Sequence, residues 1–454
     1  MNDVSELIRS AGVVGCGGAG FPTYAKLQGR VEYFIANGAE CEPLLQTDRY
    51  IMRHCPDEVV SALARVGEAA GASRCVVALK ETYAEEIEAI SSGIGRTGAP
   101  VTVCAMRSFY PAGDEQAVVR EVTGRVVPPG GIPIDVGCAV SNAATLLAAF
   151  DAMNGRPFTR KFLTVSGEVR SPAIVSAPVG TPLSDCLSLA GGASADDYCV
   201  LLGGPMMGRI ISKEETGAER VTKTTSGVII LPRDNRLSAA QSLSDRQISV
   251  RARAACIRCS QCTDLCPRYL LGHPLEPHKI MRRLALCGDL RELPLDEPVV
   301  RSAALCCECG ICELVACPMN LQPRRVNAAL RRRLSSEGIR YRRGEGQREA
   351  HPLRDMRKIP SERAAARAGV ARYKHIHIDS LAEAHPHTVF ISMSQHIGAP
   401  CVPVVEDGVR VRAGDLIASS PVGNLGSNIH ASIDGVVAIL ESSIAISSGG
   451  SHKG

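Results

Sequence analysis

The sequence predicts a multidomain α/β protein in which one large α/β unit is followed by three smaller units. Strand and helix patterns alternate over residues 1–155, which is typical of a parallel sheet covered by helices. Cysteines cluster between residues 256 and 317, and short strands separated by turn residues fill residues 386–446. At 454 residues, the chain has the length of about three or four domains.

The amino-acid composition is that of a globular protein and argues against nucleic acid and membranes as partners. Hydrophobic residues make up 45% and charged residues 22% of the chain. There is no Trp and aromatic content is 4%, so few side chains can stack on bases and we expect no nucleic acid partner. No apolar run is long enough to span a membrane and no secretory signal is visible, so we expect a cytoplasmic protein without a membrane partner. Of the 19 cysteines, those outside the two runs described below are scattered singly, as free thiols are in a reducing compartment.

A glycine-rich loop follows a short predicted helix at residues 4–11. Its glycines are Gly15, Gly17, Gly18 and Gly20. A backbone without Cβ atoms can approach a ligand closely, and its N–H groups can form a concave donor surface for phosphate. Lys26 lies on the predicted helix that follows, within reach of an anion. A plain glycine turn is the alternative, because the loop is not the G-x-G-x-x-G dinucleotide pattern.

Polar residues stand where the predicted strands of this unit end. We expect buried strands at residues 31–36, 74–79 and 101–106, with a helix after the second. The polar residues at strand ends and at the helix starts that follow are Asn37, Glu40, Glu42, Asp114, Glu115, Asn142 and Thr145. Open α/β sheets bind ligands at the carboxyl ends of their strands, so these residues are candidates for a ligand site. Asp114 and Glu115 also open a predicted helix, where complementing the helix dipole is the simpler explanation.

Two cysteine runs have the spacing of bacterial ferredoxins that hold two [4Fe-4S] clusters. The first, C-x2-C-x2-C-x3-C-P, contains Cys256, Cys259, Cys262 and Cys266. The second, with one extra residue before its last cysteine, contains Cys306, Cys309, Cys312 and Cys317. Since the fourth cysteine of each run ligates the other cluster, we assign Cys317 to the first cluster and Cys266 to the second. Cys307 is out of phase and is expected to point elsewhere, and a pair of zinc sites is the alternative.

Residues 156–235 are expected to form a β-grasp domain. Apolar runs predict two strands, a helix and two more strands, in this order. Their ranges are 162–169, 173–177, 182–190, 198–202 and 206–211. We see no convergent polar residues in this region, so we expect it to act as a spacer rather than as a ligand site.

The cysteine runs are expected to lie in a helical domain over residues 236–345, with a helix at 279–286 between them. A basic linker is expected over 346–385. Basic residues begin to outnumber acids with Arg324, Arg325, Arg331, Arg332, Arg333, Arg340, Arg342 and Arg343. A solvated helix and linker explains this excess, and a docking surface for an acidic protein or a phosphate-bearing cofactor is the alternative.

These motifs resemble the FMN- and NADH-binding subunit of respiratory complex I and its relatives. The resemblance rests on Gly-x-Gly-Gly-Ala-Gly-Phe-Pro-Thr at 15–23, Asn-Gly-Ala-Glu-Cys-Glu-Pro at 37–43, the Gly-Asp-Glu turn at 113–115 and Ser-Asn-Ala-Ala-Thr at 141–145. The chain is still more similar to the RnfC electron-transport subunits and the PduS-type cobalamin reductases. The resemblance implies a Rossmann-like FMN/NADH domain, an SLBB β-grasp domain and a ferredoxin-like domain, in that order.

Residues 386–454 resemble the barrel-sandwich, lipoyl-like domain of RnfC. A lipoyl or biotinyl domain needs a modifiable lysine at a hairpin tip, and no lysine lies between Lys374 and Lys453, so we expect no swinging arm. RnfC has this domain at its N-terminus, whereas here it is C-terminal. The domain order therefore favours the cobalamin reductases.

The resemblance also implies roles for individual residues. The residues matching FMN contacts are Gly15, Gly17, Gly18, Gly20, Lys26, Asn37, Asn142 and Thr145. Those matching the NADH side are Glu40, Glu42, Asp114 and Glu115. Cys16 departs from the pattern, because the complex I protein has Arg at this position.

The implied function is NADH-dependent reduction of cobalamin from cob(III)alamin through cob(II)alamin to cob(I)alamin, with FMN and two [4Fe-4S] clusters as cofactors. This activity would reactivate a B12-dependent diol dehydratase of propanediol utilisation inside a bacterial microcompartment, with cobalamin adenosyltransferase and shell proteins as partners. An RnfC-like subunit that passes electrons to a membrane complex is the alternative enzyme. A docking subunit with a vestigial flavin pocket is the alternative without enzyme activity. The D-x-H-x-x-G cobalamin-binding run is absent, so any contact with B12 is expected to be transient or base-on.

Overall fold

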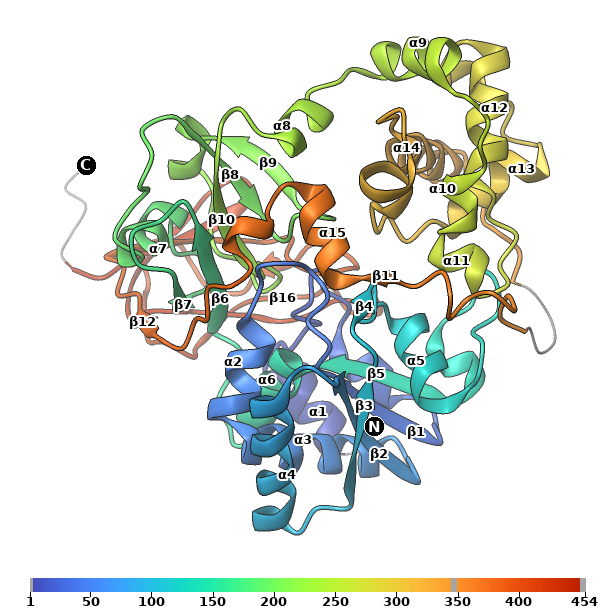
Figure 1. Ribbon diagram of the computed structural model, residues 1–454. Helices are drawn as coiled ribbons and strands as arrows, with labels where there is room; N and C mark the ends of the chain where they lie inside the picture. The colour runs from blue at the N-terminus through green and yellow to red at the C-terminus, as the bar shows by residue number, and fades with distance from the viewer. Residues whose placement is uncertain (1–2, 344–348, 450–454) are drawn as a thin grey trace.

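The computed structural model describes residues 3–343 and 349–449. The N-terminal unit is built around a parallel sheet of strand order β3-β2-β1-β5 (Figure 1). Its strands are β1 Tyr33–Asn37, β2 Arg74–Lys80, β3 Val101–Met106 and β5 Cys138–Asn142. Its helices are α1 Asp3–Ser10, α2 Thr47–His54, α3 Pro56–Ala69, α4 Ala84–Thr97, α5 Glu115–Thr123 and α6 Ala143–Met153. The strands are apolar because both faces are covered: Phe34 packs in the core with α1, α3 and α6, and Ile35 in the core with α5.

The register of this sheet brings the polar strand ends together. The three strands expected from the apolar runs all form, as parallel neighbours. β1 also pairs in parallel with β5, so that Asn37 stands beside Asn142. Among the described residues, no helix has both the length and the apolar character needed to cross a bilayer.

The β-grasp unit is a six-stranded sheet of order β12-β7-β6-β10-β8-β9. Its elements are β6 Arg160–Gly167, β7 Ala173–Pro178, α7 Leu183–Leu189, β8 Tyr198–Leu202, β9 Arg209–Ser212, β10 Gly227–Pro232 and β12 Leu381–Glu383. The strand expected at 206–211 begins only at Arg209, because the chain turns at Met206, whose N–H and C=O bond to Glu42 and Arg324. β10 was not expected, and it lies inside the sheet between β6 and β8.

The cysteine-rich unit is helical, as expected, and short helices surround its cysteines. Its helices are α8 Arg236–Gln241, α9 Asp245–Ala255, α10 Gln261–Asp264, α11 Pro267–Leu270, α12 Pro277–Cys287, α13 Pro298–Arg301 and α14 Pro323–Ser336. Several arginines of the basic region donate to backbone carbonyls: Arg331 to Cys306 at 3.0 Å and Arg333 to Leu290 at 2.7 Å. These two arginines therefore stabilise the fold by hydrogen bonds to the backbone, a role that differs from both a solvated helix and a docking surface.

The expected basic linker instead forms regular structure. Its described elements are β11 Ile359–Pro360, α15 Ser361–Ala368 and β12, while residues 344–348, which include its start, lie outside the described residues. β11 pairs with β4 (Phe109–Tyr110), and β12 pairs in parallel with β7. The basic side chains here are paired internally, since Arg354 and Lys358 contact Glu121 at 2.6 and 2.9 Å. Buried Ile359 explains why this segment packs against the fold rather than extending into solvent.

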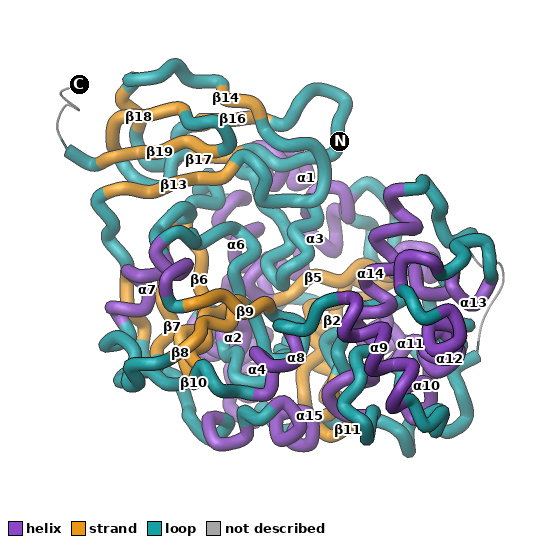
Figure 2. The backbone as a smooth tube through the Cα atoms, turned by 90° about the horizontal axis from the view of Figure 1, so that it is seen from above, coloured by secondary structure: helices purple, strands orange, loops and turns teal. Residues whose placement is uncertain are grey.

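The C-terminal unit is a pair of small antiparallel sheets, of order β13-β19-β18-β15 and β14-β16-β17. Its strands are β13 Thr388–Ser392, β14 Val402–Pro403, β15 Arg410–Val411, β16 Leu416–Ser419, β17 Ile429–His430, β18 Gly435–Ile439 and β19 Ser443–Ser447. Figure 2 shows these strands next to α1. The contact is direct, because Asn428 donates to the carbonyl of Ser10 at 3.3 Å and Ile397 donates to that of Gly20 at 3.0 Å. The domain therefore rests on the glycine loop.

Candidate functional site

A cavity of about 330 Å³, called here the main cavity, lies at the carboxyl ends of β1 and β5. Its volume is at the lower end of the range of small-molecule pockets. Of the predicted site residues, it is lined by Gly15, Gly17, Lys26, Asn37, Glu40, Glu42, Asp114, Glu115, Asn142 and Thr145. The sheet register and the loop thus bring together ten of the twelve residues that sequence reasoning assigned to flavin and nucleotide.

Gly18 and Gly20 are the two predicted residues that do not line the main cavity. A Cβ at Gly18 would meet nothing within 4 Å. Gly20 has a φ of +66°, and a Cβ there would lie 3.0 Å from Thr224 Cγ2 and 3.2 Å from the carbonyl oxygen of Gln395, so both its backbone conformation and the close packing around it favour glycine.

One end of the main cavity is formed by the glycine loop and the start of α6. The N–H of Cys16 donates to Thr145 Oγ1 at 2.9 Å. Asp48 lies at the start of α6, where its carboxylate accepts from the N–H of Ala144 at 2.8 Å and from Asn142 Nδ2 at 3.3 Å. Burial raises the pKa of this carboxyl. Sequence reasoning missed Asp48, which lies on α2 and has no motif of its own.

Glu42 lines the main cavity beside Tyr110. Its Oε2 accepts from the N–H of Met206 at 2.8 Å, and its Oε1 lies 3.5 Å from Tyr110 Oη. Burial raises the pKa of Glu42 to about 7. A Cβ at Gly204 would lie 2.2 Å from Glu42, so only glycine fits beside this carboxylate.

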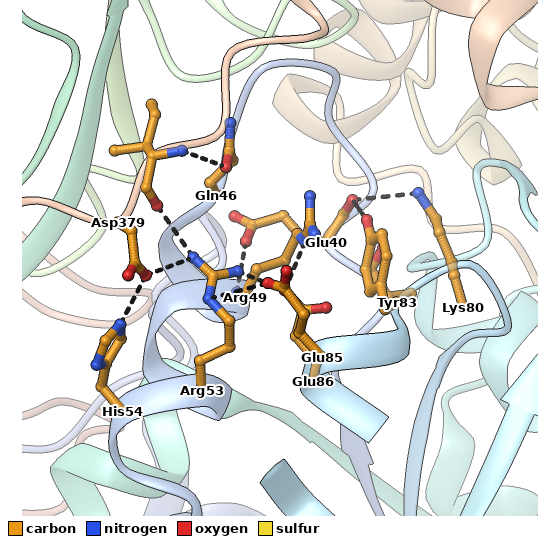
Figure 3. A network of polar contacts seen from close by, with 12 residues as sticks. Glu40, Gln46, Arg49, Arg53, His54, Lys80, Tyr83, Glu85, Glu86 and Asp379 are labelled. Carbon is orange, nitrogen blue, oxygen red and sulfur yellow. Dashed lines mark hydrogen bonds and ion pairs between the residues drawn. The ribbon is translucent and has the colours of Figure 1, made fainter. Parts of the chain in front are cut away.

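Glu40 belongs to a polar network that fixes the end of β1 (Figure 3). The N–H of Arg49 donates to its carboxylate at 3.1 Å, and Tyr83 and Lys80 both donate to its backbone carbonyl at 3.3 Å. Burial, together with the charge of Asp48, raises the pKa of Glu40 to about 8. The side chain is therefore mostly protonated at neutral pH.

The same network connects α2 to the segment around Asp379, which follows the cysteine-rich unit in the sequence. Glu86 is fully buried and accepts from Arg49 at 2.9 Å and from Arg53 at 2.5 Å. Arg53 and His54 also contact Asp379, at 3.2 and 2.7 Å (Figure 3). The network therefore joins segments more than 300 residues apart in sequence.

Three of the predicted charged site residues, Lys26, Asp114 and Glu115, have ionic partners within the protein. Asp114 caps α5 through the N–H of Gln116 at 3.1 Å, and Arg268 forms a bidentate pair with it at 2.7 and 2.9 Å. Lys26 contacts Glu115 at 2.9 Å. Asp114 thus caps α5 by a hydrogen bond, where the simpler explanation expected only complementation of the helix dipole, and it also has a partner from the cysteine-rich unit.

The cysteines line two further cavities, and each cavity combines residues from both runs. The inner cysteine cavity is lined by Cys266, Cys306, Cys307, Cys309 and Cys312. The outer cysteine cavity is lined by Cys256, Cys259, Cys262 and Cys317. Apart from Cys307, this is the grouping expected if each run supplies its last thiolate to the other cluster. Within the described part of the chain, no three His, Cys, Asp or Glu side chains are placed to hold a single metal ion. A four-iron cluster suits thiols arranged around a cavity, because each thiolate binds a different iron.

The two cysteine runs have similar backbone conformations at equivalent positions. Arg258 and Glu308, which stand at equivalent positions, both have left-handed φ values, of 59° and 56°. Ser260 and Gly310 are likewise equivalent and left-handed, at 64° and 78°. The extra residue of the second run is taken up by a π-helix, η6 (Ile311–Ala316), where the first run has the α-helix α10.

The inner cysteine cavity adjoins the main cavity. Cys307 and Cys309 line both, and Tyr110 Oη donates to the carbonyl of Cys309 at 2.7 Å. Cys307 was expected to point elsewhere, but it lies between the two cavities. By contrast, Cys259 of the outer cysteine cavity is exposed to solvent.

The β-grasp domain takes part in the site. Lys161, Met207 and Ser226 line the main cavity, although sequence reasoning expected this domain to be a spacer. These residues lack a recognisable spacing, because they converge only when β6, the β8–β9 turn and the start of β10 assemble.

Four family models match the chain. The Nuo51 FMN-binding domain matches residues 8–151, the SLBB domain 162–210, the 4Fe-4S dicluster domain 255–322 and the RnfC barrel sandwich hybrid domain 372–452. These matches confirm the predicted domain types and their order. They also confirm the prediction of FMN and iron–sulfur cofactors.

Known proteins are similar over most of the chain. Cobalamin reductase PduS of Salmonella typhimurium is 39% identical over 98% of this chain and 96% of its own length. Cobalamin reductase PduS of Citrobacter freundii is 37% identical, with the same coverage of both chains. One component of the proton-translocating ferredoxin:NAD(+) oxidoreductase complex of Clostridium ljungdahlii is 32% identical over 60% of this chain and 57% of its own length.

A flavin domain whose ligand cavity touches a dicluster domain is the core of an oxidoreductase that transfers electrons, and the chain is of this class. The alignment with each of two relatives covers nearly the whole length of both chains, so it also covers the C-terminal domain. The chain belongs to the family of the cobalamin reductase PduS.

Proposed function

We propose that this protein is an NADH-dependent cobalamin reductase that forms cob(I)alamin from cob(III)alamin by way of cob(II)alamin. The observation that carries the electron route is the position of Cys309, which lines both the main cavity and the inner cysteine cavity. The choice of acceptor is supported by the relatives with 39% and 37% identity, both cobalamin reductases.

The protein residues have separate tasks in this proposal. Bound FMN would supply the conversion of a two-electron hydride donor into single electrons. The glycine loop, Asn142 and Thr145 would hold it, and the carboxyl groups of Glu40 and Glu42 would face NADH. Cys266, Cys306, Cys309 and Cys312 would hold the cluster next to the main cavity. Cys256, Cys259, Cys262 and Cys317 would hold the other cluster, and the exposure of Cys259 supports a role for this cluster as the donor to an external acceptor.

The direct test uses protein purified without oxygen. We expect about eight irons per chain together with non-covalent FMN. With NADH and hydroxocobalamin, the protein should form cob(I)alamin, which is trapped by alkylation. NADH oxidation with ferricyanide would exclude the docking subunit with a vestigial flavin pocket. Stoichiometric zinc with little iron, or no reduction of cobalamin, would contradict the proposal.

Glu42 gives a second prediction, on pH. Its pKa of about 7 means that the carboxylate is present above pH 7 and lost below it. If it accepts a hydrogen bond from NADH, kcat/KM for NADH should fall as pH drops through about 7. Glu42→Gln should lower kcat/KM about 10- to 100-fold at pH 8 and remove this pH dependence. Gln keeps an acceptor for Met206, so FMN content should not change. Loss of flavin with unchanged NADH kinetics would contradict this division of the cavity.

The biological setting is also part of the proposal. A cobalamin reductase of this family would supply cob(I)alamin to an adenosyltransferase and so reactivate a B12-dependent diol dehydratase, within the shell of a bacterial microcompartment. The RnfC-like alternative is favoured by one observation, the 32% identity with the component of the ferredoxin:NAD(+) oxidoreductase complex over 60% of the chain. Co-purification with a membrane fraction would support that alternative.

A further inference from the structure

The main cavity receives one lysine from outside the N-terminal domain. Lys161 lies on β6, lines the cavity and is only 2% exposed. Within residues 3–343 and 349–449, no hydrogen bond or ion pair joins its ammonium group to another residue. Asp48 attracts the ammonium electrostatically but forms no ion pair with it. A buried ammonium without a hydrogen bond or ion pair is unfavourable, so an anionic ligand in the cavity would stabilise it.

The other buried lysines near this site differ from Lys161 in having partners. Lys223 donates to the carbonyls of Gly12 and Asn428 at 2.7 and 2.6 Å. Lys80 donates to the carbonyl of Glu40 at 3.3 Å. Lys26, the second lysine that lines the main cavity, is already paired with a carboxylate. Lys161 is therefore the lysine of the cavity whose charge remains available to a ligand.

The surroundings of Lys161 indicate which end of a ligand it meets. Burial raises the pKa values of Cys16 and Asp48, and the charge of Lys161 opposes both shifts, so the ammonium lies near the glycine loop and the start of α6. Exposed loop N–H groups and a helix start are the places where proteins bind phosphate. The loop itself supplies no cation here, because residues 15–20 contain no basic side chain and position 16 is a cysteine.

We propose that Lys161 is a further binding residue of the flavin site, contributed by the SLBB domain, and that its ammonium group pairs with the phosphate of FMN. This proposal rests on the proposed function in one respect, that FMN occupies the main cavity. The isoalloxazine would then extend towards Glu42 and Cys309, which also line the main cavity. The SLBB domain thus completes a phosphate site in which the lysine of the FMN-binding domain, Lys26, is already paired with Glu115.

The test compares Lys161→Met with the parent in the full chain, after bound flavin has been removed. FMN affinity, measured by quenching of flavin fluorescence, should fall about 10- to 100-fold, as expected for a lost charged hydrogen bond. Riboflavin, which lacks the phosphate, should bind parent and variant equally. Lys161→Arg keeps the charge and should retain most of the FMN affinity.

Arg160→Met is the matched control, because Arg160 is the neighbouring basic residue on β6 and bonds to Ser176 outside the main cavity. It should leave both flavin affinities unchanged. The flavin-free Lys161→Met protein should unfold at the temperature of the parent or above it, because the substitution removes a buried charge that has no hydrogen bond or ion pair. Equal FMN affinity in parent and Lys161→Met, or an equal loss for FMN and riboflavin, would overturn the phosphate pairing. Failure of the parent to bind any flavin would instead contradict the proposed function.

Discussion

Cys266→Ala is expected to remove the cluster held by Cys306, Cys309 and Cys312 and to leave the other cluster in place. The reason is that Cys266, although it belongs to the first cysteine run, lines the inner cysteine cavity together with the cysteines of the second. Iron content should fall from about eight to about four per chain, and one of the two signals in the electron paramagnetic resonance spectrum of the reduced protein should disappear.

Two further variants, Cys317→Ala and Cys307→Ala, test whether each cysteine ligates the cluster that its cavity indicates. Cys317→Ala should have the mirror effect, because Cys317 lines the outer cysteine cavity with Cys256, Cys259 and Cys262. Cys307→Ala should keep both clusters, because the inner cysteine cavity already has four thiols at ferredoxin spacing. If Cys266→Ala removed only the cluster of its own run, the exchange of fourth ligands would be wrong.

The local parts of the site could be predicted from the sequence because their signals are local. The glycine loop is a run of residues without Cβ atoms, and parallel strands necessarily end at one edge, which places Asn37 beside Asn142. The cysteine runs have a fixed spacing, and the turns between the cysteines recur at equivalent positions of both. A one-residue insertion changed an α-helix into a π-helix without moving Cys317 out of the outer cysteine cavity.

The remaining features depend on contacts that no short segment encodes. Lys161 enters the main cavity only because the β-grasp sheet packs on the N-terminal domain, and Asp48 becomes a site residue only because α2 reaches the start of α6. β12 joins β7 across about 200 residues of sequence, so its three residues have no local pattern that distinguishes them from a linker. β10 is different, since its buried run of Val228 to Leu231 was a visible strand signal.

The route of electrons gives the second large effect. The double variant Cys259→Ser with Cys309→Ser removes one ligand from each cysteine cavity, and we expect it to lose formation of cob(I)alamin from NADH. The same protein should keep NADH oxidation with ferricyanide, a small acceptor that can be reduced at the flavin site. The physical reason is position: the inner cysteine cavity touches the main cavity through Cys309, while Cys259 of the outer cavity is exposed.

The single variants give the order of the two clusters. Cys309→Ser interrupts the route next to the main cavity, and Cys259→Ser interrupts it at the surface, so each alone should stop cob(I)alamin formation if the clusters act in series. Reduction with dithionite should still reduce the inner cluster in Cys259→Ser, which shows that the block lies beyond it. Retention of FMN in each variant is the control, because neither serine substitution changes the glycine loop or Lys161. If the double variant still formed cob(I)alamin at the parent rate, the clusters would be structural or would serve another acceptor, and the RnfC-like alternative would then be favoured.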